Sequence, residues 1–382
     1  MLDADQDVSF VPMAAVDEVS GTIVASSVRP YGEVARGFTH FQDYDVILAK
    51  ITPSMENGKA AVARDLVNGT GIGSTEFHVL RSGGAIDPQF LWHFVRQQSF
   101  RDNAQLVMTG AVGQQRVPAH YLKAHQIPMP PLAEQRRIAE KLGELLAITA
   151  EAAENLGRIP DLAAQYKRRL LAGGCSGELT ASWRKAVGAP EAKMMRLEDV
   201  AESFSYGTAA KSVKQGTVAV LRMGNIQDGE LDWSDLVFTS DAEEIAKYRL
   251  QAGDVLFNRT NSPALVGKTA VYHGEQDAVY AGYLIRVRCG SELLPDYLGH
   301  CLNSPAGRAY SWQVKSDGVS QSNINAKKLA AFSFLLPSLD EQTEINRRIA
   351  VGLRWLDQIL AEHAAAVSLL PRVRTHKQDS HG

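Results

Sequence analysis

Apolar residues recur at alternating spacings of three and four along residues 132–171, which is typical of a helix that packs against another helix. This first seam consists of Ile138, Leu142, Leu145, Thr149, Ala152, Leu156, Ile159, Ala163, Tyr166 and Leu170. A second seam of the same kind consists of Ile345, Ile349, Gly352, Leu356, Ile359, His363, Ala366 and Leu370. The pattern therefore predicts two long helices, over residues 132–172 and 337–373, that lie against each other.

The first of these helices contains a proline within its seam. Pro160 has no backbone N–H and clashes with the preceding turn, so we expect a kink or break near Ile159. Gly173 and Gly174 follow the last seam position, and we expect the helix to end there.

Both helices begin with related residues. Pro130-Pro131-Leu132-Ala133-Glu134-Gln135 corresponds to Pro337-Ser338-Leu339-Asp340-Glu341-Gln342 at an offset of 207 residues. The segments before each helix also match, residues 41–50 with 250–259, 57–62 with 266–271, and 109–117 with 316–324. An internal repeat of this size indicates duplication of one domain-and-helix unit.

The segments before the helices read as mixed α/β domains. Residues 45–51 and 76–81 are short apolar runs that predict strands, and residues 88–95 predict a helix with proline in its first turn. The predicted order is a first mixed domain over 1–131, helix 132–172, linker 173–195, second mixed domain 196–336, helix 337–373 and tail 374–382. The fold class is α+β, with a pseudo-twofold repeat.

The composition fits a soluble globular chain, with 45% hydrophobic and 22% charged residues. No apolar run approaches the roughly 20 residues that span a membrane, and the acidic start does not resemble a signal peptide. Cys175, Cys289 and Cys301 are scattered, so we expect free thiols and a cytoplasmic protein. The net charge of −3 gives no sign of nucleic-acid binding, which must rest on local features.

Known catalytic patterns are incomplete in this sequence. The Gly267-Lys268-Thr269 triplet has Ser262 where a phosphate-binding loop needs its first glycine. Asn261-Ser262-Pro263-Ala264 does not match the Asn/Asp-Pro-Pro-aromatic motif of amino-methyltransferases. His93 and His300 lie in matching predicted helices, where a packed histidine is the expected interpretation. We expect a non-catalytic protein with no metal site.

The alternation of two mixed domains with two helices that begin Pro-Leu-x-Glu-Gln or Ser-Leu-x-Glu-Gln resembles the specificity (HsdS-type) subunit of Type I restriction-modification systems. The segment Ser176-Gly177-Glu178-Leu179-Thr180 is similar to the end of the family's helix, and the resemblance covers residues 8–371. It implies two target-recognition domains that each read half of a split DNA sequence. It also implies that the two helices form an antiparallel coiled coil that docks methyltransferase subunits.

The resemblance further implies which molecules the chain meets. The implied partners are double-stranded DNA and two methyltransferase subunits, with restriction subunits as a further partner. S-adenosylmethionine, ATP and Mg would belong to those partners, and this chain would bind no cofactor. Partner contacts are expected at the helix starts, namely Glu134, Gln135, Arg137, Glu341, Gln342 and Arg348.

The predicted DNA contacts are polar side chains in the repeated loops. Arginine can bind guanine and asparagine adenine through paired hydrogen bonds, while lysine and threonine suit phosphates or base edges. For single positions, an ordinary solvated loop is an equally good interpretation. The candidates are Lys50, Thr52, Lys59, Gln114, Gln115 and Arg116 in the first domain, and Arg222, Asn225, Asn258, Arg259, Thr260, Asn261, Lys268, Gln321 and Asn323 in the second.

Two departures from the family pattern leave an alternative open. The first domain lacks a counterpart of residues 195–217, and the second helix is followed by residues 371–377 without a Ser-Gly-Glu-Leu segment. The alternative is a truncated or orphan coiled-coil scaffold that no longer reads DNA. The first predicted helix spans about 42 Å between residues 132 and 159, at ~1.5 Å per residue, which suits half-sites roughly 34 Å apart, but coiled-coil packing alone explains it equally well.

Overall fold

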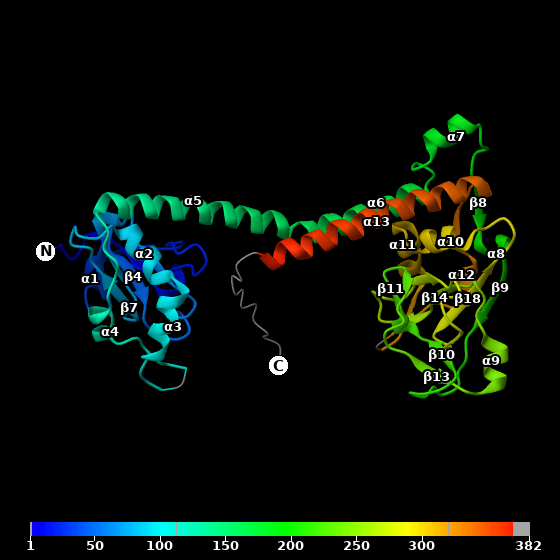
Figure 1. Ribbon diagram of the computed structural model, residues 1–382, viewed down its shortest axis with the longest axis horizontal. Helices are drawn as coiled ribbons and strands as arrows, with labels where there is room; N and C mark the ends of the chain where they lie inside the picture. Colours follow the sequence, from blue (N-terminus) through cyan, green and yellow to red (C-terminus); the bar gives the residue numbers. More distant parts are fainter. Residues whose placement is uncertain (1, 112, 320, 370–382) are drawn as a thin grey trace. The chain divides into compact units, whose positions relative to one another are not determined.

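The computed structural model describes residues 2–111, 113–319 and 321–369 (Figure 1). Leu370 of the second seam, the last predicted turn of the second helix and the tail 374–382 lie outside the described residues. The chain divides into two compact units, unit 1 over Met1–Ala152 and unit 2 over Ala153–Gly382. The division falls inside a helix, so it differs from the domain boundary at residue 131 expected from the sequence.

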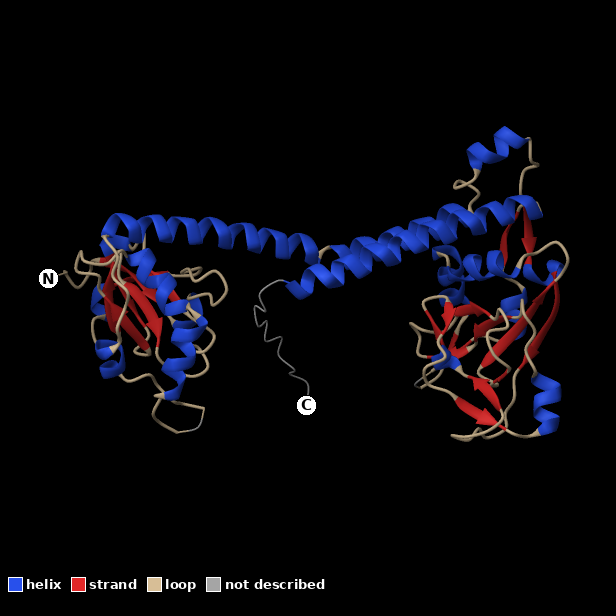
Figure 2. Ribbon diagram, in the orientation of Figure 1, coloured by secondary structure: helices blue, strands red, loops and turns tan. Residues whose placement is uncertain are grey.

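Unit 1 contains two small sheets and five helices among its described residues (Figure 2). One sheet has the order β2-β1-β6-β3 and the other β5-β4-β7. The strands are β1 (Asp7–Val11), β2 (Ser27–Pro30), β3 (Thr39–Gln42), β4 (Val46–Ala49), β5 (Ala60–Val62), β6 (Thr70–Gly73) and β7 (Phe77–Leu80). The helices are α1 (Tyr31–Val34), α2 (Pro88–Arg96), α3 (Gln98–Leu106), α4 (Ala119–Ala124) and α5 (Leu132–Gly157).

Unit 2 repeats this arrangement and adds to it. Its helices are α6 (Ile159–Cys175), α7 (Ala181–Val187), α8 (Leu197–Val200), α9 (Ala242–Tyr248), α10 (Pro295–Asn303), α11 (Pro305–Val314), α12 (Ala326–Ala330) and α13 (Leu339–Leu369). Its strands are β8 (Lys193–Arg196), β9 (Ala201–Tyr206), β10 (Val218–Leu221), β11 (Ile226–Gln227), β12 (Glu230–Leu231), β13 (Val237–Thr239), β14 (Val255–Asn258), β15 (Thr260–Asn261), β16 (Thr269–Val271), β17 (Ala278–Tyr280), β18 (Leu284–Cys289), β19 (Ser316–Asp317), β20 (Ser322–Asn323) and β21 (Ser333–Leu336).

The repeat extends to strand pairing. In unit 1, β1 pairs antiparallel with β2 and parallel with β6, and in unit 2, β10 pairs antiparallel with β13 and parallel with β17. Strand β4 lies between β5 and β7, and β14 lies between β16 and β18, all antiparallel. The α+β class and the duplication predicted from the sequence are confirmed.

Helices α6 and α13 form an antiparallel pair within unit 2. The Tyr166 and Trp355 rings have centroids 5.6 Å apart, and His363 Nε2 lies 3.0 Å from the Leu156 carbonyl oxygen. A Cβ at Gly352 would lie 2.6 Å from Leu170, so glycine permits this close approach. In unit 1 the same seam is open, with Leu142 and Leu145 37% and 50% exposed.

The helix boundaries follow the expectations with one correction. Helix α5 ends at Gly157 and α6 starts at Ile159, with Pro160 in its first turn, so the predicted break is confirmed. Helix α6 passes through Gly173 and Gly174 and ends at Cys175, later than expected. A Cβ at Gly174 would lie 2.8 Å from Ile349, so this glycine serves helix packing, whereas Gly177 has the positive φ of +75°.

Candidate nucleic-acid interface

Unit 2 joins the two predicted DNA-contact loops into one small sheet. Strand β15, which follows the buried β14, pairs with β20, and β20 pairs with β19. Thr260 lies opposite Asn323 and Asn261 opposite Ser322. The Asn323 amide also donates to Thr260 Oγ1 at 2.8 Å. Residues about sixty positions apart thus form one surface element.

Unit 1 joins the equivalent loops at the same register. Ile51 and Arg116 form an antiparallel bridge, and the Thr52 N–H donates to the Gln115 carbonyl at 3.0 Å. The Val117 N–H donates to the Lys50 carbonyl at 2.8 Å. The chain fold therefore brings together the two predicted loop sets in both units, while their side chains differ.

Arg259 is held by one ring and two hydrogen bonds in unit 2. Its guanidinium lies 4.8 Å from the centre of the Tyr206 ring, which is a cation–π distance. It donates to the Gly282 carbonyl at 3.2 Å and to Asn323 Oδ1 at 3.3 Å. Because Asn323 receives one bond and donates another to Thr260, Arg259 fixes the orientation of the Asn323 amide.

Arg116 is held by a carboxylate in unit 1. Its Nε lies 3.0 Å from Glu76 Oε2 and its terminal nitrogen 2.9 Å from Oε1. The Arg116 hydrogen bonds lower the pKa of Glu76, and the nearby positive charge of Lys50 lowers it further. Arg116 lies in the second loop of the unit 1 junction, and Arg259 lies in the first loop of the unit 2 junction. Each pair of loops therefore contains one arginine whose guanidinium is hydrogen-bonded.

Other loop candidates are more accessible. Gln114 and Gln321 are exposed, whereas Lys50, Thr52 and Gln115 are half-buried. Thr52 donates its hydroxyl to Glu56 Oε1 at 2.7 Å. Asn261 is half-buried and its Oδ1 accepts from the Ser262 N–H at 2.8 Å.

Two candidates lie inside the fold, which corrects the expectation of a direct contact for them. Asn258 is 0% exposed, and Asn225, 2% exposed, bonds the carbonyls of Asp232 and Asp235 at 2.9 Å. The Asn225 side chain holds backbone in place, and the Asn258 amide nitrogen lies 3.5 Å from the Met223 carbonyl oxygen.

Two charged candidates of this group are half-buried and hydrogen-bonded. Arg222 pairs with Asp235 at 3.0 Å, and Lys268 donates to Gln227 at 2.9 Å. Lys59 is half-buried, as is Lys268.

Three of the predicted partner contacts are buried and have structural roles. Gln135, Gln342 and Glu341 are 1%, 0% and 0% exposed. The two glutamines bond backbone at the helix starts, and Glu341 receives hydrogen bonds from Thr180 and Arg184. They do not present a surface to another protein, which corrects that expectation.

The remaining helix-start candidates are accessible to different degrees. Arg137 is 69% exposed and pairs with Glu134 at 2.7 Å, and its hydrogen bonds lower the pKa of Glu134. Arg348 donates to Glu344 and to the Leu179 carbonyl. Arg347 and Arg348 together lower the pKa of Glu344 to about 2.

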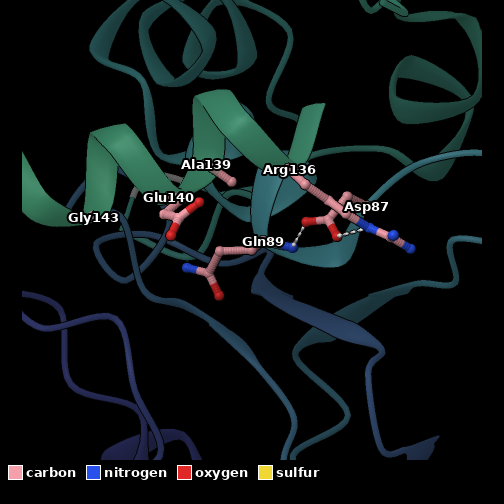
Figure 3. Close-up of a pocket in the computed structure, with 6 residues that line it drawn as sticks. All are labelled: Asp87, Gln89, Arg136, Ala139, Glu140 and Gly143. Carbon is pink, nitrogen blue, oxygen red and sulfur yellow. Dashed lines mark hydrogen bonds and ion pairs between the residues drawn. The ribbon is translucent and has the colours of Figure 1, made fainter. Parts of the chain in front are cut away.

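An open hollow of about 420 Å³ lies between α2 and α5 in unit 1 (Figure 3). Its small lining residues, Ala139 and Gly143, come from α5, and its charged ones include Glu140 and Arg136, which lies 3.8 Å from Asp87. Asp87 also caps α2 by accepting from the Gln89 and Phe90 N–H groups.

Sequence reasoning missed Tyr206. It ends β9, a strand without a counterpart among the described residues of unit 1, so the comparison of repeats could not single it out. Its ring stacks with Arg259 and its hydroxyl accepts from the Ala326 N–H at 2.9 Å. An aromatic residue at the end of a strand was the only signal.

Within the described ranges, no cluster of three or more His, Cys, Asp or Glu side chains could hold a metal ion. Nor does any helix in the described part of the chain have the length and apolar character needed to cross a membrane.

The chain is similar to proteins of one family. The model of the Type I restriction modification DNA specificity domain matches residues 7–157 and again 190–360. The specificity subunit of the Type I restriction enzyme EcoKI from Escherichia coli (strain K12) is 30% identical over 287 residues, 74% of this chain and 62% of that protein. The StySPI specificity subunit from Salmonella potsdam is 30% identical over 285 residues, 73% of this chain and 61% of that protein. The chain thus spans less than two thirds of each relative.

Solved structures show the same fold. The HsdS subunit from Thermoanaerobacter tengcongensis superposes with a TM-score of 0.64 at 21% identity, covering 98% of this chain and 87% of that one. A chain from a structure of a type I R-M system superposes with a TM-score of 0.61 at 20% identity, covering 96% and 89%.

Proposed function

Because the chain belongs to the family of Type I restriction modification DNA specificity proteins, we propose that it is a DNA-recognition subunit of a Type I restriction-modification complex. It contacts a two-part DNA target through units 1 and 2 and performs no chemistry itself. Methylation and cleavage, with S-adenosylmethionine, ATP and Mg, belong to partner subunits.

The observation that carries this proposal is the repeated loop junction. In both units the loop after the central strand, β4 or β14, pairs with the loop before the last short helix, α4 or α12. The paired residues are Ile51 and Arg116 in unit 1, and Thr260 and Asn323 in unit 2. The scaffold is shared, but the side chains at these places differ. Two domains that bind different half-sites need a shared backbone scaffold and different side-chain contacts.

The exposed and half-buried side chains define the proposed contacts. In unit 2, Asn261, Gln321 and Asn323 carry amides that can bind adenine through paired hydrogen bonds. In unit 1, Gln114 and Gln115 carry the same group. Lys50, Lys59 and Lys268 are the proposed phosphate contacts, while Arg259 and Arg116 hold the loops in shape and reach DNA only by exchanging their present partners. Asn258 and Asn225 are left out because they are buried.

The helices are the proposed docking surface for methyltransferase subunits. On α5, Leu142, Leu145 and Ile148 are 37%, 50% and 63% exposed. The hollow beside Arg136 and Glu140 adds a charged recess next to this apolar stripe. A partner helix that covers the stripe would bury apolar surface worth about 25 cal/mol per Å².

The test is DNA selection by the reconstituted complex. The chain is purified with its methyltransferase subunit, and bound duplexes are selected from a random library and sequenced. The proposal predicts a motif with two defined halves and an undefined gap, and affinity that falls steeply with salt because partner subunits neutralise phosphates. Enrichment of no sequence would refute DNA reading.

A scaffold that binds partners without reading DNA is the second candidate. The exposed apolar stripe on α5 favours this scaffold role, because such a stripe can pair with a partner helix without any contact with DNA. Co-purification with the methyltransferase without sequence selection would support this candidate.

A further inference from the structure

Each loop junction has a third member besides its two loops. In unit 1 the Lys50 N–H donates to the Glu76 carbonyl at 2.9 Å, and in unit 2 the Arg259 N–H donates to the Tyr283 carbonyl at 3.0 Å. Glu76 directly precedes β7, and Tyr283 directly precedes β18. Neither residue was expected from the sequence, because the matching segments of the repeat do not include them.

The second loop of each junction meets the same backbone. The Val117 N–H donates to the Lys50 carbonyl at 2.8 Å, and the Ile324 N–H donates to the Arg259 carbonyl at 2.9 Å. The residue before each of these donors therefore lies at the same place in its unit. Three positions correspond between the units, namely Lys50, Glu76 and Arg116 in unit 1 with Arg259, Tyr283 and Asn323 in unit 2.

Two of these positions hold an ion pair in unit 1. The Arg116 and Glu76 side chains, joined at 2.9 Å, are 41% and 26% exposed. Water screens a pair of this exposure, so it contributes little to folding stability. A carboxylate beside DNA also repels phosphates. Neither folding nor phosphate binding therefore accounts for Glu76 at the centre of the junction.

The ion pair is complementary to one base pair. In the major groove, cytosine presents the N4 amino group as a donor, and guanine presents O6 and N7 as two adjacent acceptors. An ionised carboxylate only accepts hydrogen bonds, and a guanidinium donates two parallel ones. An A·T pair does not offer two adjacent acceptors on one base, so it suits this pair of side chains less well.

We propose that Glu76 is a base-reading residue that, together with Arg116, binds one C·G base pair in the half-site of unit 1. The carboxylate accepts from the cytosine N4 amino group, and the guanidinium donates to guanine O6 and N7. The two side chains thus exchange their mutual hydrogen bonds for bonds to the base pair. This inference rests on the proposed function and assigns one base pair within the DNA target.

The equivalent positions in unit 2 carry no charge. Tyr283 is 50% exposed and has a hydroxyl, and Asn323 has an amide. An asparagine amide binds adenine N6 and N7, and a hydroxyl can donate to thymine O4. The same two places therefore bind an A·T pair in the half-site of unit 2.

The experiment is DNA selection by the complex with the methyltransferase subunit, using Glu76→Ala, Arg116→Ala and the double variant. Each single change should reduce discrimination at one and the same C·G position by about ten- to hundredfold. The double variant should lose no more than either single variant, because both side chains act on one base pair. Asp277→Asn is the matched control. It removes a carboxylate that accepts from Arg249 at 2.8 Å outside the junction, and it should leave the motif unchanged.

A transplant between the units gives a second test. Glu76→Tyr combined with Arg116→Asn should change the selected pair at that position from C·G to A·T. Tyr283→Phe should reduce discrimination at one A·T position of the other half only. These variants differ from loss of folding, because the untouched half of the motif reports an intact complex.

Three results would overturn the inference while a two-part motif upheld the proposed function. The motif of the unaltered chain could lack a C·G pair in either half. Glu76→Ala could leave every position of both halves unchanged, or it could weaken all positions of one half alike, which would indicate a role in folding. Enrichment of no sequence by the unaltered chain would refute DNA reading and this inference together.

Discussion

Gln135 and Gln342 make the same three hydrogen bonds, one at the start of α5 and the other at the start of α13. Each Oε1 accepts a backbone N–H at 2.8 Å, from Asp87 and Leu294. Each Nε2 donates at 2.9 Å to the carbonyl before the helix, of Pro130 and Pro337, and also to a loop carbonyl, of Ala85 at 3.4 Å and Glu292 at 2.8 Å. The duplication thus reproduces side-chain contacts as well as strand order, and it fixes each long helix to its own unit.

Replacing Gln342 by alanine should destabilise unit 2. The change leaves the Leu294 N–H and two carbonyls without a partner in a buried place, at a cost of about 2 kcal/mol in the free energy of unfolding. A urea titration of the purified chain measures it. Gln321→Ala, at an exposed position, is the control and should leave the unfolding midpoint unchanged; equal effects of the two changes would contradict the assignment.

Replacing Glu341 by glutamine should be more harmful than the same change at Glu134. Glu341 is buried against Arg184, and neutralising it leaves Arg184 with only the exposed Glu191 carboxylate at 3.5 Å, which costs about 3 kcal/mol. Glu134 is partly exposed and pairs only with Arg137, so Glu134→Gln should change stability little. Thermal unfolding of the two variants compares the same substitution in two environments, and similar losses would show that burial of Glu341 is unimportant.

His300 should make unit 2 sensitive to acid. Burial lowers the pKa of His300 from 6.5 to about 4, against the opposing effect of Asp296. The unfolded chain therefore binds the proton first, so stability should fall as the pH drops from about 6.5 towards about 4, by up to about 3 kcal/mol. His300→Gln should reduce this loss when unfolding is measured at pH 7 and pH 4.5. His120→Gln, at an exposed site, should not reduce this loss of stability. If the His300 variant lost as much stability between pH 7 and pH 4.5 as the unaltered chain, another group would cause the acid sensitivity.

Substitutions in one loop junction should change one half of the DNA target. Asn261→Ala removes an amide from the unit 2 junction, and Gln114→Ala removes one from unit 1, at a cost of about 1–3 kcal/mol in discrimination at the base concerned. Arg259→Ala should act on the same half as Asn261→Ala, because Arg259 orients Asn323. Sequencing of selected DNA reads both halves at once. If either change weakened both halves alike, those residues would support folding or overall affinity and would not read bases.

The periodic parts of the sequence predicted the fold well. The helix starts, expected at residues 132 and 337, are observed at Leu132 and Leu339, and the break expected near Ile159 falls directly before it, because apolar spacing and proline geometry act locally. Strands 45–51 and 76–81 were expected and are observed as Val46–Ala49 and Phe77–Leu80. The repeat revealed the two loops as matching segments, but not that they pair with each other. The pairing of Thr260 with Asn323 joins residues far apart in the sequence, and no local sequence pattern indicates it.

The burial of polar residues could not be predicted from the sequence. Glu341 and Gln342 read as exposed charge and amide on a helix start, yet both are buried by residues far along the chain, Thr180 and Leu294 among them. Gly174 read as a helix stop because its role depends on Ile349 of another helix. The sequence placed Asn258 in the loop after the strand, whereas Asn258 is the last residue of β14 and is buried.

Whether both units read DNA is decided by the adenine methylome. The chain is expressed with its methyltransferase subunit in a host that otherwise lacks DNA methylation, and methylated sites are mapped across the genome. If both units bind their own half-site, the sites share one split motif with two different defined halves, one of which changes in the Asn261→Ala variant and the other in Gln114→Ala. A motif with a single defined half or two identical halves, or no methylation while the two proteins still co-purify, would show that the two units do not each read DNA.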